Sequence, residues 1–198
     1  MKTVVLAAGD FPACGSPGWN ALEAADRIVC CDGAADILLE RTGRVPDAVV
    51  GDLDSLKGNF SGVVRIPEQE TNDLEKAVRY CREKGWSGIV VAGATGKRED
   101  HSIGNVFRAL DLGVELATDH GTFYPVDGVR VFETGRGAAV SIFAPDPQTV
   151  ASSKGLEWPL DGVEFRNLYC ATLNRAVSPR VEITVSRPVL VFVSQAPS

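Results

Sequence analysis

Residues 1 to about 118 alternate short apolar runs with helix-like segments, and this alternation constrains the fold more than any other feature of the sequence. The apolar runs are Thr3–Ala8, Arg27–Cys31, Ala48–Gly51, Gly62–Ile66, Gly88–Ala92 and Val114–Thr118. Strands that are joined through helices pair in parallel with right-handed crossovers. The pattern therefore predicts an α/β domain with an open, mostly parallel, Rossmann-like sheet.

The clearest helix is expected at Asp73–Lys84. Asn72 is a favourable N-cap, and Glu75 three residues later forms a capping-box-like pair with it. One apolar face follows from helical spacing, with Leu74, Ala77, Val78 and Cys81 in line, and Gly85 ends the helix. Further helices are expected at Trp19–Ala25, at Asp32–Arg41 and behind an N-cap at Asp100, the last with an apolar face of Ile103, Val106, Phe107 and Leu110.

After about Asp119 the helical periodicity disappears and short β-rich runs are separated by turn residues. These runs are Val129–Glu133, Ala139–Phe143, Val163–Leu168, Val181–Val185 and Val189–Val193. Alternating patterns between glycine- and proline-rich turns are typical of antiparallel strands. The sequence therefore predicts two domains, an α/β domain at 1–120 and a smaller all-β sandwich at 121–198.

Composition excludes several classes of function. The net charge of −6 and the absence of a basic block argue against nucleic acid as the main partner. No apolar run approaches the roughly 18 residues that span a bilayer, and the apolar N-terminus is too short for a signal peptide. The five cysteines are odd in number and lack Cys-x-x-Cys spacing, so neither a disulfide framework nor a zinc site is indicated. A cytoplasmic protein is expected.

The candidate functional residues follow the expected strands. In an open parallel sheet, ligands bind beyond the carboxyl ends of the strands. That rule collects four segments at one edge, namely Asp32-Gly33, Asp52 with Asp54, Gln69 to Asp73, and Gly93 to Asp100. Each acid alone is as readily explained by a turn or a helix cap. Their convergence favours a bound cation, because carboxylates about 5 Å apart repel by about 3 kcal/mol at an effective dielectric of about 20.

Asp52 and Asp54 are separated by one residue, so in an extended chain their side chains point to the same side. A divalent metal between them is the interpretation of interest, and a solvated turn is the alternative. Positive charge comes from the glycine-rich segment that includes Gly96, Lys97 and Arg98. This segment is not a Walker A loop, but a glycine-rich turn from a buried strand into a helix offers backbone N–H groups to a phosphate.

Taken in order, these segments resemble the thiamin pyrophosphokinase family. Asp32-Gly33-Ala34-Ala35 resembles its Asp-Gly-Gly-Ala turn, and Gly51-Asp52-Leu53-Asp54-Ser55 resembles its Gly-Asp-(Phe/Leu)-Asp-Ser motif. The segments Gln69–Glu75 and Gly93–His101, the latter followed by Asn105, resemble its acidic helix start and its Gly-Ala-x-Gly-x-Arg-x-Asp-His block. Gly155-Leu156-Glu157-Trp158 and Asn174 match the smaller domain in order. Two departures are Ala34 with Asp36, where Gly and Asn are usual, and Ala171-Thr172-Leu173-Asn174, where the family has a serine-rich segment.

The resemblance implies transfer of pyrophosphate from ATP to the hydroxyl of thiamin, giving AMP and thiamin diphosphate. It also implies a homodimer in which thiamin lies between the first domain of one subunit and the second domain of the other. The nucleotide and substrate residues that it implies are Asp32, Gly33, Gln69, Gly96, Lys97, Arg98, Thr172 and Asn174.

The expected roles follow from the chemistry of phosphate transfer, which depends on positioning and charge neutralisation. Asp52, Asp54 and Asp73 are expected to hold Mg²⁺, and Arg98 to stabilise phosphate charge. Asp100 is expected to orient or deprotonate the acceptor hydroxyl, with a metal role as the alternative, so Asp100, Arg98 and Asp73 are the candidate catalytic residues. Two rival functions are a metal-dependent phosphohydrolase and a nucleotide-binding regulatory module that is not an enzyme.

Overall fold

The computed structural model describes residues 1–195, and the chain divides into two compact units between Asp119 and His120. The first unit contains β1 (Thr3–Leu6), α1 (Pro17–Glu23), β2 (Arg27–Cys31), α2 (Ala34–Thr42), β3 (Ala48–Gly51), β4 (Val63–Arg65), α3 (Asp73–Glu83), β5 (Ile89–Ala92), α4 (Glu99–Leu112) and β6 (Glu115–Ala117). Each unit is described by itself below.

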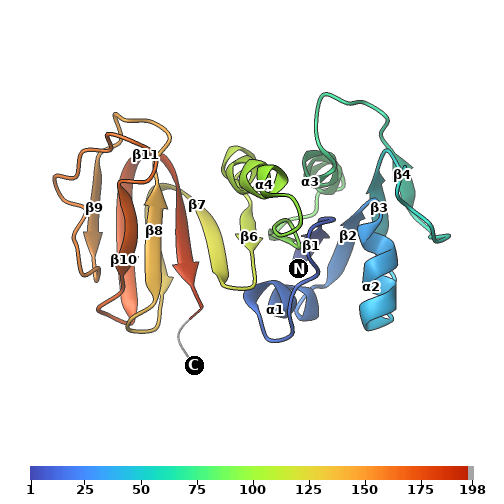
Figure 1. Ribbon diagram of the computed structural model, residues 1–198, viewed down its shortest axis with the longest axis horizontal. Coiled ribbons are helices and arrows are strands. Elements are labelled where there is room, and N and C mark those ends of the chain that lie inside the picture. Colours follow the sequence, from blue (N-terminus) through green and yellow to red (C-terminus); the bar gives the residue numbers. More distant parts are fainter. Residues whose placement is uncertain (196–198) are drawn as a thin grey trace. The chain divides into compact units, whose positions relative to one another are not determined.

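The sheet of the first unit has the strand order β6-β5-β1-β2-β3-β4, and all of its neighbouring strands are parallel. Helices α1 and α2 cover one face, and α3 and α4 lie on the other (Figure 1). The chain order reverses between β1 and β5, which is where ligands bind in open α/β sheets. The predicted open parallel sheet is therefore observed in this unit.

The buried face of α3 explains how the helix is held against the sheet. Asn72 caps the helix by accepting a hydrogen bond from the backbone N–H of Glu75 at 3.0 Å. The predicted apolar residues are all buried, namely Leu74, Ala77, Val78 and Cys81. Burying one large aliphatic side chain contributes about 1.5–3 kcal/mol, so this face fixes the helix and, with it, the position of its first residue, Asp73.

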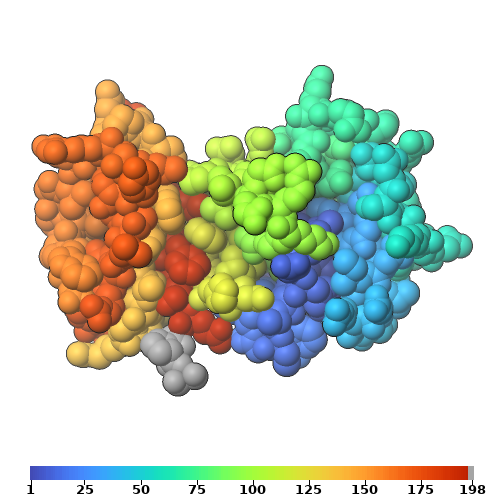
Figure 2. Space-filling model, in the orientation of Figure 1, coloured from blue at the N-terminus to red at the C-terminus, as the bar shows by residue number. Residues whose placement is uncertain are grey.

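Helix α4 differs from the expectation in two ways. It begins at Glu99 with Arg98 as N-cap, so Asp100 lies in the first turn and is not the cap. Its predicted apolar face is only partly covered, because Ile103 is 61% exposed and Val106, Phe107 and Leu110 are half-buried. Ala109 is the one fully buried residue of the helix. The helix packs against α3 and against β6, the last strand of this unit's sheet. Figure 2 shows much of α4 on the outer surface, in bright green.

The second unit is built from antiparallel strands: β7 (Gly121–Glu133), β8 (Ala139–Phe143), β9 (Ala151–Lys154), β10 (Ala171–Arg175) and β11 (Arg180–Ser194). The long strands β7 and β11 pair along their lengths, with a shift of register between Val185 and Val189. The other edge of β11 pairs with β9 before the shift and with β8 after it, and β10 adds to β8. The core of this unit includes Val140, Ile142, Phe165, Ile183 and Val191.

The strand predictions for this unit were partly wrong. The runs expected at Val181–Val185 and Val189–Val193 form the single strand β11, and the run at Val129–Glu133 is the end of the longer β7. The run at Val163–Leu168 is not a strand, because its backbone makes local hydrogen bonds, such as that from Arg166 to Glu164. Phe165 is buried in the core, and Val163 packs against it. Strands β9 and β10 were missed because polar residues dominate them.

Among residues 1–195, no helix is long and apolar enough to cross a membrane.

Candidate active site

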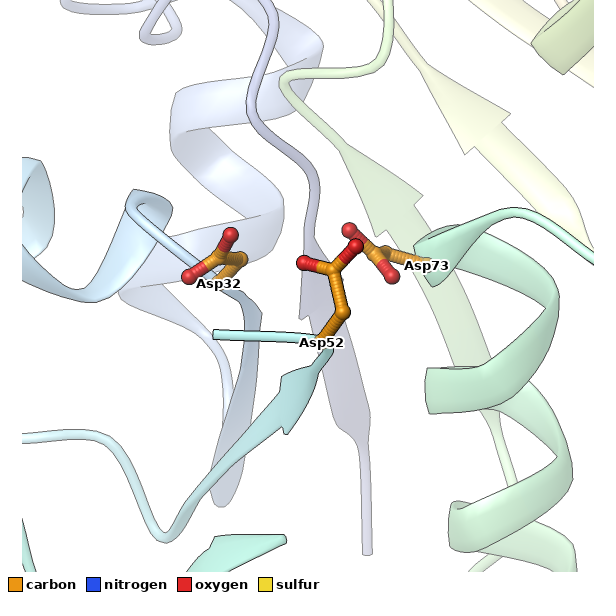
Figure 3. A group of neighbouring side chains, drawn as sticks. All are labelled: Asp32, Asp52 and Asp73. Carbon is orange, nitrogen blue, oxygen red and sulfur yellow. The ribbon is translucent and has the colours of Figure 1, made fainter. Parts of the chain in front are cut away.

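Three carboxylates from separate parts of the first unit come together at the carboxyl edge of its sheet. Asp32 follows β2, Asp52 follows β3, and Asp73 is the first residue of α3. Each offers an oxygen that lies within 4.8 Å of an oxygen of both of the others. Figure 3 shows the three side chains directed toward one another. The cluster therefore combines two strand ends with a helix start that the packing of α3 holds in place.

Asp32 has one oxygen that is hydrogen-bonded and one that is not. Its Oδ2 accepts hydrogen bonds from the backbone N–H of Ser55 at 3.0 Å and from the Ser55 hydroxyl at 2.7 Å. Its Oδ1 is buried and has no hydrogen-bond partner among the residues that the structure describes. A buried carboxylate oxygen without a donor is costly unless a cation balances it. The orphaned oxygen, set among two further carboxylates, fits a hard divalent cation such as Mg²⁺.

The environments of Asp52 and Asp73 differ. Asp52 accepts hydrogen bonds from the backbone N–H of Asp54 at 3.3 Å and from the Gln69 amide at 3.4 Å, and these hold its pKa below the ordinary value. Burial raises the pKa of Asp73, and the neighbouring Lys76 opposes that rise. The nearby charges of Asp52 and Asp32 act in the same direction as burial on Asp73. The mutual repulsion that the sequence predicted is thus present at this edge.

The predicted pairing of Asp52 with Asp54 relied on a backbone geometry that the structure does not show. It assumed an extended chain through Leu53, but Leu53 has a φ of 70°, in the left-handed region. Asp54 is exposed and is not one of the three grouped carboxylates, and its backbone N–H donates to Asp52 Oδ1. Asp32, which was assigned to the nucleotide, takes the third position instead.

Lys76 is a residue of this site that the sequence reasoning missed. Its side chain is 2% exposed, and its ammonium lies 3.2 Å from Asp73 Oδ1. Helical spacing could have found it, since residues three apart share a face and Asp73 and Lys76 are such a pair. The residue type gave no such signal, because lysine is rarely fully buried.

A cavity of about 320 Å³ opens beside the cluster, at the point where the chain order reverses. Of the residues predicted to function here, it is lined by Asp52, Gln69, Asp73, Gly96, Lys97 and Arg98. Further lining comes from the chain after β1, from the start of α3 and from His101 and Asn105 on α4. Its size is at the lower end of the range for small-molecule sites.

Two loops form one wall of the cavity and are joined through their backbones. The N–H groups of Gly9 and Asp10 donate to the carbonyls of Gly93 and Thr95, at 2.7 and 2.8 Å. Gly96 has a φ of 80°, and a Cβ there would lie 2.0 Å from Asp10 Oδ2, so the position requires glycine. Lys97 donates from its ammonium to the carbonyl of Ala8 at 2.7 Å, which fixes it at the same wall.

Arg98 and Asp100 form a bidentate ion pair on the exposed side of this loop. The guanidinium donates from Nε to Asp100 Oδ1 at 3.1 Å and from Nη2 to Oδ2 at 2.6 Å. This pairing lowers the pKa of Asp100 and raises that of Arg98. Because a bidentate guanidinium is also the geometry that binds phosphate, an incoming phosphate would compete with Asp100 for Arg98.

An amide network connects the start of α3, through Asn105 of α4, to the loop after β5. Asn72 donates from its side chain to Asn105 Oδ1 at 3.2 Å, and Asn105 donates to the carbonyl of Ala94 at 2.9 Å. Asn105 appeared in the sequence only as part of a motif, and the structure gives it this positioning contact. The network ties the start of α3, where Asp73 lies, to the glycine-rich wall.

The turn after β2 supports the cluster through its backbone and side chains. Gly33 is the N-cap of α2, and a Cβ there would lie 3.1 Å from the Ser55 hydroxyl. Asp36, which departs from the usual asparagine, accepts hydrogen bonds from the N–H groups of Lys57 at 2.9 Å and Gly58 at 2.7 Å. These contacts fasten the segment after Asp52 to the start of α2.

In the second unit, the side chains of Thr172 and Asn174 are engaged by their own domain. Asn174 is buried, accepts hydrogen bonds from the N–H groups of Trp158 and Arg175, and donates to the carbonyl of Trp158 at 2.6 Å. The Thr172 hydroxyl donates to the carbonyl of Tyr169 at 2.9 Å. Trp158 is thereby held in place with its side chain 54% exposed. Leu173 is 85% exposed with a φ of 62°, at a shift of register in β10.

Comparison with known families gives two matches that together cover most of the chain. The family model described as the catalytic domain of thiamin pyrophosphokinase matches residues 19–117. The model described as the substrate-binding domain of thiamin pyrophosphokinase matches residues 121–192. The two matches fall on either side of the division between the compact units.

Two curated proteins that are similar to this chain are also thiamin pyrophosphokinases. Thiamin pyrophosphokinase 1 of Caenorhabditis elegans is 34% identical over 87 residues, which cover 38% of this chain and 36% of that protein. Thiamine pyrophosphokinase 1 of Oryza sativa subsp. japonica is 24% identical over 175 residues, covering 69% of this chain and 66% of that protein. The chain thus spans less than two thirds of the length of both curated relatives.

Solved structures support the fold over the full length. The crystal structure of a thiamin pyrophosphokinase family protein from Enterococcus faecalis has a TM-score of 0.81 at 15% identity and covers 100% of both chains. At such low identity, the likeness shows a shared fold.

Proposed function

The chain belongs to the thiamin pyrophosphokinase family, and on this premise we propose that it transfers pyrophosphate from ATP to the hydroxyl of thiamin, giving AMP and thiamin diphosphate. The observation that carries the proposal is the group of Asp32, Asp52 and Asp73 beside a cavity walled by a glycine-rich loop. Carboxylates for a metal and N–H groups for phosphates are the parts that such a transfer needs.

We assign the first unit to ATP and Mg²⁺. Asp32, Asp52 and Asp73 would hold the metal, whose chemistry is to neutralise phosphate charge and align the reacting oxygens. Asp54 is left with a supporting role in the turn, through its N–H to Asp52. Gly96, Lys97 and Arg98 line the cavity where the triphosphate would lie, and Gln69 faces it beside Asp52.

The reaction requires the hydroxyl oxygen of thiamin to form a bond with the β-phosphorus while the bond to the oxygen bridging the α- and β-phosphorus breaks. The electron pair of that bond leaves with AMP, and the hydroxyl proton needs an acceptor. We assign this proton to Asp100, which phosphate would release from Arg98 by taking its place on the guanidinium. Arg98 would then stabilise the charge of the transferred group.

The second unit is proposed to bind thiamin and to form a homodimer, with the active site completed by the partner subunit. Trp158 is the side chain that we assign to the thiamin rings, because an exposed indole held by a buried asparagine is prepared for stacking. Asn174 then acts by positioning Trp158, and Thr172 by shaping the neighbouring turn. We also propose that the strands of this unit pack as a two-layer sandwich around their common core.

The cytoplasm is the proposed location, supported by five cysteines that are all free.

Product identification tests the proposed activity. The full chain is incubated with ATP, Mg²⁺ and thiamin, and the products are identified by mass. AMP with thiamin diphosphate is expected. Inorganic phosphate that appears without thiamin would support the phosphohydrolase instead, and bound but unchanged ATP would support the regulatory module.

A further inference from the structure

Lys76 is the one lysine among residues 1–195 whose side chain is fully buried, with 2% of its surface exposed. Lysine side chains ordinarily bury their methylene groups and extend the ammonium into water. A buried ammonium is tolerated when carboxylates surround it. The question is therefore what this fixed positive charge does at the edge of the acidic cluster.

The charge of Lys76 acts on two of the three carboxylates. Its ammonium donates to Asp73 Oδ1 at 3.2 Å, from one turn further along α3. Its charge also acts on Asp52, so both carboxylates experience it. Because Lys76 occupies Oδ1 of Asp73, the other oxygen of this carboxylate is left for a different partner.

The net charge of the three carboxylates and Lys76 balances the charge of one divalent ion. Three ionised carboxylates carry −3, the ammonium carries +1, and the sum of −2 is cancelled by one cation of charge +2. Asp32 Oδ1, buried and without a hydrogen-bond partner in the described part of the chain, independently indicates that a ligand belongs here.

We propose that Lys76 is a built-in counter-ion of the cluster of Asp32, Asp52 and Asp73. Its charge restricts the cluster to a single divalent cation, and its hydrogen bond holds the Asp73 carboxylate in place for that cation. The inference rests on the metal site of the proposed function. Lys76 is a positioning residue in this account, since it acts on the cation through Asp73 and through its charge.

The test is a titration of the full chain with Mn²⁺ in the absence of nucleotide. The electron paramagnetic resonance signal of free Mn²⁺ measures how much of the ion is bound. The unchanged protein is expected to bind one tight Mn²⁺, which Asp32→Asn abolishes. In Lys76→Met the uncompensated carboxylates are expected to bind the first ion about tenfold more tightly and to admit a second. Lys76→Arg keeps the charge and is expected to bind one ion.

Lys84→Met is the matched control, because it removes a lysine charge from the C-cap of the same helix, where the ammonium lies over the ring of Tyr80. Its Mn²⁺ binding should equal that of the unchanged protein, which separates a local effect from the change in net charge. Circular dichroism and the thermal midpoint establish that each variant is folded. Where Lys76→Met is not folded, Lys76→Gln takes its place.

The count for the unchanged protein tests the inference without any substitution of Lys76. The inference would be overturned if the unchanged protein bound two tight Mn²⁺ ions that Asp32→Asn abolishes. It would also be overturned if the unchanged protein bound no tight Mn²⁺. Equal affinity and number of ions in Lys76→Met and Lys84→Met would also overturn it. Failure of the proposed activity is a separate result, because Mn²⁺ binding does not depend on whether thiamin diphosphate forms.

Discussion

Ser55 donates two hydrogen bonds to a single oxygen of Asp32, from its backbone N–H at 3.0 Å and from its hydroxyl at 2.7 Å. The other oxygen of Asp32 is buried and lacks a partner among the described residues. The segment after β3 thus orients a carboxylate that follows β2 and that lies beside those of Asp52 and Asp73 (Figure 3). This relationship links the Asp32-Gly33 turn to the Asp52–Ser55 segment in space.

Ser55→Ala removes the hydroxyl donor and leaves the backbone donor. A net loss of about 0.5–1.5 kcal/mol in the free energy of unfolding is expected, together with a several-fold weaker apparent Mg²⁺ affinity, because the Asp32 carboxylate is less firmly oriented. Urea unfolding and Mg²⁺ titration of turnover measure the two effects. Ser61→Ala, at an exposed turn, is the control and should change neither. Unchanged Mg²⁺ affinity in Ser55→Ala would show that Ser55 does not orient a ligand.

Asp52→Asn and Asp54→Asn distinguish the observed cluster from the spacing that the sequence first suggested. Asp52 belongs to the carboxylate group, whereas Asp54 is exposed beyond the turn at Leu53. Asp52→Asn is expected to lower kcat by about 10²-fold or more, because charge stabilisation is lost at the phosphates, and Asp54→Asn should lower it much less. Steady-state kinetics at saturating Mg²⁺ make the comparison. A larger loss of kcat in Asp54→Asn than in Asp52→Asn would place Asp54, and not Asp52, among the metal ligands.

Glu68 gives a pH-dependent contribution to stability. The hydroxyl and N–H of Thr71 and the guanidinium of Arg79 lower the pKa of Glu68 from 4.5 to about 2. Because the folded state holds the carboxylate ionised, this stabilisation is complete above pH 4.5 and is lost as the pH falls through about 2. Glu68→Gln should therefore unfold at a lower urea concentration than the unchanged protein at neutral pH, with the difference shrinking across that window.

Glu70→Gln is the control for the acidic window, since it removes the charge of an exposed neighbour in the same turn. Its urea midpoint should follow that of the unchanged protein across the whole range of pH. A difference between Glu68→Gln and the unchanged protein that persists at pH 2 would contradict the lowered pKa.

Trp158→Ala and Asn174→Ala test the thiamin side. Trp158→Ala is expected to raise KM for thiamin about tenfold, because one stacking contact with a thiamin ring is lost. KM for ATP and the free energy of unfolding should change little. Asn174→Ala should raise the same KM and also cost about 1–3 kcal/mol of stability, because it leaves backbone groups of Trp158 without partners. Val150→Ala, at another exposed position of this domain, is the control. An unchanged KM for thiamin in both variants would remove Trp158 from the site.

The alternation of strands and helices could be predicted in the first unit because nearly every strand there is buried on both faces and appears as a continuous apolar run. The second unit shows the limit of that signal. Strands β9 and β10 contain mostly small and polar residues, and they pair because longer strands supply the edges. The shift of register within β11 lies between Val185 and Val189, where Pro188 cannot donate to the ladder. The sequence marked this break but did not indicate that both runs belong to one strand, because that follows from their long-range pairing with β7.

The site was predictable where it depends on topology and unpredictable where it depends on single torsion angles. The carboxyl ends of parallel strands identified Asp52 and Asp73 as neighbours, and the structure brings them together. The left-handed φ of Leu53 breaks the extended chain that the sequence suggested between Asp52 and Asp54, and the burial of Lys76 contradicts the usual exposure of lysine. Asn174 was assigned to the substrate through the family resemblance, and nothing in the sequence indicated its hydrogen bonds to Trp158 and Arg175.

The central claim is the transfer of an intact pyrophosphate group, and the position of radioactive phosphorus tests it most directly. The protein is incubated with thiamin, Mg²⁺ and ATP labelled separately at the α-, β- or γ-phosphorus. The account predicts that the β and γ labels appear together in thiamin diphosphate and that the α label appears in AMP. A thiamin product that carries the γ label alone, with ADP as the other product, would contradict it, as would recovery of the γ label only as free phosphate.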